Sequence, residues 1–176
     1  MAMQYSAMAR NWPHGKDLRT GRFSETGRIY LITTCCVGRN RVFQNVALGK
    51  IIEDELRQSD NAELTRTLAY VVMPDHLHWM FELIHGNELH SVVRRVKGIS
   101  AHRINKIVRR TGRIWQPGYH DRALRQEASF EAVGNYIIYN PVRAGIIQSI
   151  DDYPLWDAMW INRKRGVDDL GHKRAT

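Results

Sequence analysis

Two histidines separated by one residue are the pair in this sequence best placed to hold a metal ion. The segment from His76 to Leu83 (HLHWMFEL) has the composition of a β-strand. Side chains alternate between the two faces of a strand, so His76 and His78 share one face and Leu77 takes the other. Two imidazoles at that spacing can reach one divalent ion. The alternative is a pair of half-exposed histidines on a sheet face without a ligand.

A tyrosine and an asparagine four residues apart form the second candidate group. Tyr136 and Asn140 would lie on the same face of a helix. Asn140 precedes Pro141, so the helix is expected to end there, and the side-chain oxygen of Asn140 can turn outward to a metal with Tyr136 one turn back. Tyr139 points in another direction and is a poorer partner. The alternative is that both tyrosines lie at the edge of the core and Asn140 is a helix C-cap.

The elements that must position these residues follow from hydrophobic periodicity and turn residues. We predict strands at 28–37, 65–73 and 76–83, helices at 45–58, 88–110 and 129–139, and an irregular or strand-like segment at 113–125. The first six elements match the split β-α-β order of ferredoxin-like (RRM-like) domains, an α+β sandwich with an antiparallel sheet. An additional C-terminal helix carries the tyrosine.

The length of 176 residues fits a single domain. We expect an irregular arm at 1–26, the main domain at 27–160 and a basic frayed tail at 161–176. The only cysteines, Cys35 and Cys36, are adjacent, which is typical of a reduced protein without a disulfide framework. The apolar runs are too short to cross a membrane, and the N-terminus lacks the pattern of a signal peptide, so a cytoplasmic location is expected.

The net charge of +8 and the pI of about 9.8 predict a polyanionic partner, with nucleic acid first and an anionic membrane surface second. The positive charge is concentrated in one predicted helix and the segment that follows it, which contain no acidic residue between Arg94 and Arg113. We interpret this helix as a candidate phosphate-binding face. The alternative is an ordinary solvated charged face.

Six segments in the same order make the sequence resemble the REP-associated tyrosine transposases, relatives of the single-tyrosine HUH transposases of insertion sequences. The resemblance runs from about Gly21 to Trp156 and is much more specific than either short motif. Its segments are GRFSETGRIYLITT at the start, NRVF at 40–43, VMPDHLHW at 72–79, WQPGYHDRALR at 115–125, YIIYNPVRAG at 136–145 and DYPLW at 152–156.

The resemblance implies a role for each candidate residue. His76 and His78 match the HUH metal ligands, Tyr136 matches the nucleophile, and Asn140 matches the polar residue that completes a Mg²⁺ or Mn²⁺ site. It further implies a ferredoxin-like fold and a DNA transposition reaction in which single-stranded DNA is cut and rejoined through a 5′-phosphotyrosine. The expected substrates are REP palindromes, which fold as hairpins flanked by a short single strand. A monomer is favoured and a dimer stays open.

Candidate DNA contacts follow from charge and aromatic character. They are the arm and loop residues Arg19, Arg22, Arg28, Arg39 and Arg41, the helix residues Arg94, Arg95, Lys97 and Arg103, and the base-stacking candidate Trp115. Trp79 and Tyr119 are further stacking candidates, and for all three aromatics core packing is an equal alternative. His120 is a candidate general base, with a plain surface role favoured.

Two other functions fit parts of the pattern. A domesticated relative could bind hairpin DNA as a regulator without cutting it, although the retained His76, His78, Tyr136 and Asn140 argue for an enzyme. An RRM-like RNA-binding domain shares the expected topology. The sequence, however, has no clear aromatic run of the kind that stacks RNA bases on the first or third strand.

Overall fold

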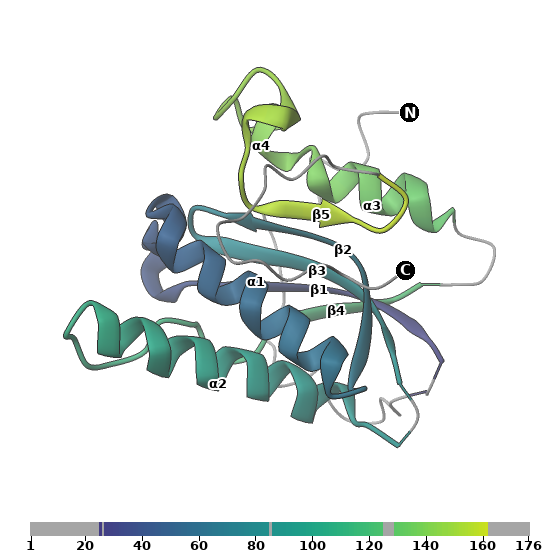
Figure 1. Cartoon of the computed structure of the whole chain (residues 1–176), viewed down its shortest axis with the longest axis horizontal. Helices are drawn as coiled ribbons and strands as arrows, with labels where there is room; N and C mark the ends of the chain where they lie inside the picture. The colour runs from purple at the N-terminus through teal and green to yellow at the C-terminus, as the bar shows by residue number, and fades with distance from the viewer. Residues whose placement is uncertain (1–24, 26, 85, 125–128, 162–176) are drawn as a thin grey trace, which may run out of the picture.

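A computed structural model describes residues 25, 27–84, 86–124 and 129–161, and Figure 1 shows how their helices and strands are arranged. Apart from Glu25 and Ile161, the expected arm and tail lie outside the described residues. The strands are β1 (Ile29–Cys35), β2 (Thr65–Met73), β3 (His76–Leu83), β4 (His120–Ala123) and β5 (Trp156–Ala158). The helices are α1 (Val46–Asn61), α2 (Leu89–Ile107), α3 (Phe130–Ile138) and α4 (Asn140–Arg143).

The described strands form one antiparallel sheet in the order β4-β1-β3-β2-β5. Its first four strands, with α1 and α2 as the crossovers, have the split β-α-β arrangement, so the predicted ferredoxin-like α+β fold is confirmed. β2 and β3 are joined through the turn at Pro74 and Asp75, as expected. β5 extends the sheet at the β2 edge, where Val71 pairs with Trp156.

The two faces of the sheet have different covers. α1 and α2 pack against each other on one face, and the phenol of Tyr70 (β2) donates to the Glu53 carboxylate of α1 over 2.9 Å. Met80 of β3 lies on the other face. Its Cε is 3.2 Å from the position that a Cβ on Gly134 of α3 would take. α3 therefore covers the sheet face opposite α1 and α2, above β2 and β5 (Figure 1).

The ends of the first two helices differ from the expectation by three residues each. α1 continues to Asn61 past Ser59, whose hydroxyl donates to the carbonyl of Glu55 over 3.0 Å and so joins the helix instead of ending it. α2 follows the N-cap residue Glu88 and ends at Ile107, three residues before the expected end at 110. Within the described residues, no helix is long and apolar enough to span a bilayer.

The helix that carries Tyr136 breaks close to Pro141, as expected, but Asn140 is the first residue of the next helix and neither ends nor caps the first one. α3 begins after Ser129, whose hydroxyl accepts from the backbone of Ala132, and ends at Ile138. The short helix α4 follows at once with Pro141 as its second residue, a position that suits proline because its missing N–H has no intrahelical partner there. The chain from Tyr136 to Arg143 therefore lies on two consecutive helical pieces.

Candidate active site

The histidine pair faces the α3 side of the sheet. His76, His78 and Met80 are alternate residues of β3, so their side chains share one face of the sheet, and Met80 contacts α3 on that face. Both histidines are half-buried, and their ring centroids are 4.8 Å apart with the ring planes nearly perpendicular. Alternation along the strand predicted that the two histidines share a face, and the structure shows that α3 covers the same face of the sheet.

Each imidazole is held at its Nδ1 atom by a different polar partner. Nδ1 of His76 lies 2.6 Å from the Asp75 carboxylate, which can only accept, so this nitrogen carries the hydrogen. Nδ1 of His78 lies 2.8 Å from the hydroxyl of Thr33, its direct neighbour across β1. Polar partners of this kind fix the ring orientation of metal-binding histidines and leave the Nε2 atom as the donor.

The surroundings of His78 favour its neutral imidazole form. Burial lowers the pKa of His78 to about 3, and the positive charges of His76, Arg143 and Arg39 act in the same direction. The hydrogen bond from His76 holds the pKa of Asp75 below its ordinary value despite partial burial. Near neutral pH the group therefore combines an ionised carboxylate with a neutral His78 ring, which is the form that binds metals.

Arg143 contacts both Tyr136 and Asn140. Tyr136 is 48% exposed on α3, and the guanidinium carbon of Arg143 lies 3.8 Å from the centre of its ring. Nη2 of Arg143 donates to Oδ1 of Asn140 over 2.5 Å, and the charge of Arg143 also acts on His78. Tyr136, Asn140 and Arg143 therefore form one cluster of contacting side chains.

The donor set fits a hard divalent ion only if Asn140 is included. Among the residues that the structure describes, no three histidine, cysteine, aspartate or glutamate side chains gather around one point. Two imidazole nitrogens therefore need a donor of another type, and the candidate predicted from the sequence is the amide oxygen of Asn140, which accepts a hydrogen bond from Arg143. Two nitrogens, one oxygen and water suit Mn²⁺ and are compatible with Mg²⁺.

The predicted basic contacts of the arm and first loop are dispersed. Arg19 and Arg22 lie outside the described residues. Arg28 pairs with Glu25, and Arg41 is exposed in the loop before α1. Arg39 lies next to the histidines: it pairs with the Asp75 carboxylate at 3.4 Å and donates to the thiol of Cys35 at 3.1 Å.

The predicted basic helix is α2, on the sheet face opposite the histidines. Arg94 and Arg95 are exposed and line a shallow groove on its outer surface. Lys97 donates to the backbone carbonyls of Gln116 and Gly118. Arg103 pairs with Asp54 and Glu55 of α1. Lys97 and Arg103 therefore have partners inside the fold, and Arg94 and Arg95 keep their charge turned to solvent.

Two stacking candidates are core residues. Trp115 is 5% exposed, tilts against Phe43 with ring centroids 5.1 Å apart, and donates from Nε1 to the Ser100 hydroxyl. Trp79 is buried and donates to the Thr67 hydroxyl in the same way. These contacts favour the core-packing alternative for both. Tyr119 is half-buried before β4.

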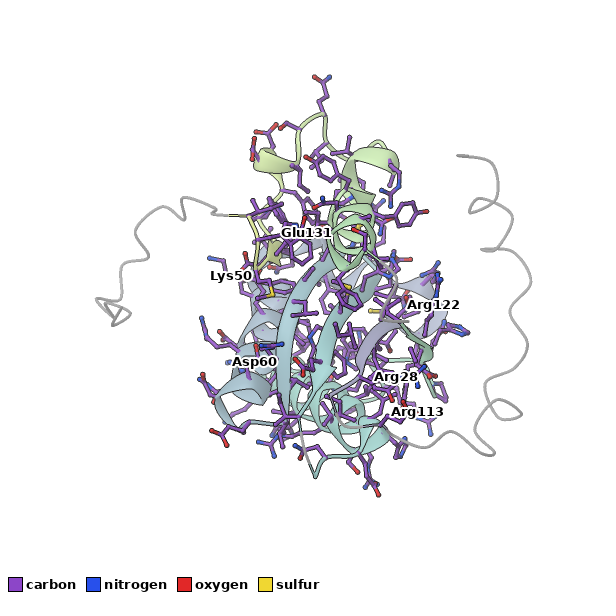
Figure 2. All side chains as sticks on the ribbon, turned by 90° about the vertical axis from the view of Figure 1, so that its right-hand side faces the viewer. Arg28, Lys50, Asp60, Arg113, Arg122 and Glu131 are labelled. Atoms are coloured by element: carbon purple, nitrogen blue, oxygen red, sulfur yellow. The ribbon has the colours of Figure 1, made fainter. Side chains whose placement is uncertain are left out.

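The sequence did not predict that part of the sheet face carrying His76 and His78 is open to solvent. On β1, Leu31 and Thr33 are only half-buried, whereas the residues that alternate with them are buried. Their β4 neighbours are Arg122, which is exposed, and His120, which shares the row of Thr33 and His78. Figure 2 shows Arg122 on the same side of the molecule as Arg28 and Arg113, away from Lys50 and Asp60 of α1. Spacing alone does not show which side of a strand-like segment is uncovered.

Comparisons with known proteins show which family the chain resembles. Residues 26–140 match the model of a family described as "Transposase IS200 like". A REP-associated tyrosine transposase of Escherichia coli (strain K12) is 30% identical over 87 residues, 49% of this chain and 50% of that protein. A putative REP-associated tyrosine transposase of Haemophilus influenzae is 24% identical over 98 residues, 50% of this chain and 56% of the relative. The chain thus matches about half the length of these relatives.

A solved structure has the same fold. It is described as a REP-associated tyrosine transposase bound to a REP hairpin, and it is 22% identical to this chain with a TM-score of 0.66. The match covers 77% of this chain and 79% of that one.

Proposed function

This chain belongs to the IS200-like transposase family, and from that premise we propose that it cuts and rejoins single-stranded DNA beside a hairpin through a covalent link to Tyr136. The observation that carries the proposal is the cluster on one sheet face, in which Arg143 contacts Tyr136 and Asn140 and acts on His78.

The proposed reaction is a transesterification. The phenol oxygen of Tyr136 attacks the scissile phosphorus, so an Oη–P bond forms as the P–O3′ bond breaks. The phenol gives up its proton to solvent, and the departing 3′ oxygen takes one from solvent. The product ester keeps the free energy of the broken bond, so a 3′-hydroxyl can later attack it and rejoin the strand. The half-exposed position of Tyr136 leaves its phenol accessible to a strand.

His76, His78 and Asn140 would hold a divalent ion, Mg²⁺ or Mn²⁺. When bound, such an ion supplies positive charge against the non-bridging oxygens of the scissile phosphate. Asp75 and Thr33 fix the two imidazole rings through their Nδ1 atoms. Burial keeps the His78 ring neutral, so no proton has to leave it before a metal binds.

The proposed substrate is hairpin DNA with a single-stranded flank. One similar protein of the same fold is described as bound to a REP hairpin. In this chain, the open half of the histidine face carries Arg122 and His120, and Arg39 lies beside the histidine pair. Cationic side chains around a half-open sheet face suit a flexible strand that must bring one phosphate to Tyr136.

The test is a covalent adduct between protein and DNA. The protein is incubated with a labelled REP-type hairpin carrying single-stranded flanks, with Mn²⁺ or Mg²⁺, and resolved under denaturing conditions. We expect an adduct with the unaltered protein, none with Tyr136→Phe although the hairpin still binds, and retention in the matched variant Tyr139→Phe. An adduct that survives in Tyr136→Phe and disappears in Tyr139→Phe would move the nucleophile. Binding without any adduct would make the chain a hairpin-binding regulator.

A further inference from the structure

Arg143 occupies a place in the cluster to which no role has been given. It lies seven residues after Tyr136 and three after Asn140. Because α4 continues directly from α3, with the backbone N–H of Arg143 bonded to the carbonyl of Tyr139 over 3.0 Å, these spacings place the three side chains on one side. The guanidinium carbon of Arg143 lies 3.8 Å from the centre of the Tyr136 ring, within the range of a cation–π contact.

Arg143 is hydrogen-bonded to Asn140 and also interacts with Tyr136. A guanidinium has five N–H donors in a planar fork, and one of them goes to Oδ1 of Asn140. The side chain is exposed, so further donors are accessible to a bound strand. The guanidinium therefore contacts both the proposed nucleophile, Tyr136, and the proposed metal ligand Asn140.

We propose that Arg143 is a catalytic residue that contacts the non-bridging oxygens of the scissile phosphate and stabilises the negative charge that grows there as Tyr136 attacks. The inference rests on the proposed function of this site. Arginine suits the task because its planar fork matches two phosphate oxygens, while its flat face can remain on an aromatic ring. A preorganised cation of this kind accelerates phosphoryl transfer without taking part in proton transfer.

The phosphate contact can be tested without cleavage. In a Tyr136→Phe background, which keeps the ring under Arg143, hairpin DNA is bound with each flanking phosphate replaced in turn by a neutral methylphosphonate, in EDTA. At one position we expect the methylphosphonate to weaken binding about tenfold in the protein that keeps Arg143. In the protein that also carries Arg143→Ala, the same methylphosphonate should cause little further loss. Arg57→Ala, which removes an exposed arginine from α1, should leave that loss unchanged. Additive effects at every position would overturn the proposed contact.

The catalytic role is tested by the rate of adduct formation with Mn²⁺ in the protein with Tyr136 intact. We expect Arg143→Ala to slow the adduct about 100-fold, Arg143→Lys to fall between, and added guanidinium ion to restore part of the rate in Arg143→Ala only. Mn²⁺ affinity should change far less than the rate. An equal loss of Mn²⁺ affinity, without guanidinium rescue, would make Arg143 a positioning residue acting through Asn140 and overturn the proposal. Should the unaltered protein form no adduct, the proposed function fails, while the methylphosphonate cycle still decides the contact.

Discussion

The Nδ1 atom of each histidine in the pair has its own polar partner, and this distinguishes the pair from two ordinary sheet histidines. Asp75 accepts from His76, and the hydroxyl of Thr33 contacts His78. Partners of this kind fix the orientation of both rings before a metal arrives, and the Asp75 carboxylate also fixes the tautomer of His76, which lowers the cost of assembling the site. The same arrangement explains why Asp75, which the sequence presents as a turn residue, belongs to the site.

Removing the carboxylate should weaken metal binding. We expect Asp75→Ala to lower Mn²⁺ affinity by roughly 10-fold or more, because the His76 ring loses the acceptor that orients it. Mn²⁺ electron paramagnetic resonance titration measures the affinity. Glu131→Gln, which removes an exposed carboxylate from α3, is the control and should bind Mn²⁺ like the unaltered protein. Unchanged affinity in Asp75→Ala would show that the carboxylate does not support the ligand.

At the residue scale, the sequence predicts what depends on local spacing. Alternation along β3 correctly places His76 and His78 on one face. The spacing of three and seven residues would also have identified Arg143 as a neighbour of Asn140 and Tyr136. Thr33 is different, because it is 45 residues from His78 and meets it only through the register of β1 on β3. That register is a tertiary property without a local signal.

The position of α3 depends on a glycine at its contact with the sheet. A Cβ on Gly134 would lie 2.2 Å from the nearest atom of the Trp160 ring and 3.2 Å from Met80. The missing side chain therefore lets α3 approach β3, and that approach sets the distance between Tyr136 and the histidine pair. Trp160 also donates from Nε1 to the side chain of Asn135 over 3.0 Å, which further fixes the helix.

Adding one methyl group at this contact should displace the helix. We expect Gly134→Ala to lower the free energy of unfolding by about 1–3 kcal/mol, because the clash cannot relax without moving α3 or Trp160. Gly98→Ala is the matched control: it also replaces a helical glycine, but in open space, and should be neutral or stabilising by about 0.5–1 kcal/mol. Chemical denaturation measures both variants. Equal effects of the two substitutions would contradict the packing argument.

Two basic surfaces on opposite sides of the sheet are candidates for the proposed DNA contact. Arg122 lies on the open half of the histidine face, and Arg95 lies on the outer surface of α2. Because the strand must reach Tyr136, we expect Arg122→Ala to weaken hairpin binding more than Arg95→Ala and to reduce the salt dependence by about one phosphate contact. Fluorescence anisotropy at several salt concentrations tests this. A larger loss in Arg95→Ala would place the DNA on α2, as the charge pattern of the sequence suggests.

At the element scale, long periodic segments are predictable and short ones are not. The alternation of β1 to β3 and the apolar stripes of α1 and α2 predict the ferredoxin-like order, which the structure confirms. β4, α4 and β5 have only three or four residues each. Their structure depends on partners distant in sequence, such as the pairing of Trp156 with Val71 and the bond from the Tyr153 phenol to the Val72 carbonyl.

For the whole molecule, the return of the chain to the sheet after α4 is part of what holds the fold together. The Tyr153 phenol is buried and donates to the Val72 carbonyl over 2.7 Å. Burial raises the pKa of Tyr153 to about 12 from an ordinary value of 10. The folded state therefore retains this proton at pH values where the unfolded chain has lost it, and stability depends on pH in that range.

Stability should decline on the alkaline side. Above pH 10 the unfolded phenol ionises first, so rising pH favours the unfolded state until about pH 12, and the free energy of unfolding should fall by about 2 kcal/mol over that range. Tyr153→Phe should be less stable at pH 8 but show a shallower decline above pH 10. Denaturant titrations at each pH measure the difference in stability between the unaltered protein and Tyr153→Phe. Burial also raises the pKa of Cys36 to about 12, but Cys36 is present in both proteins, so its contribution cancels in this difference. Parallel declines would contradict a Tyr153 contribution.

The most direct test of the proposed mechanism is to identify the residue that becomes covalently linked to DNA. After reaction with hairpin DNA and Mn²⁺, nuclease trimming and trypsin digestion, the peptide 126–143 contains both Tyr136 and Tyr139, and fragmentation mass spectrometry separates them. We expect a nucleotide linked through its 5′-phosphate to Tyr136. A nucleotide on Tyr139, on any residue outside this peptide, or on none would contradict the proposed mechanism.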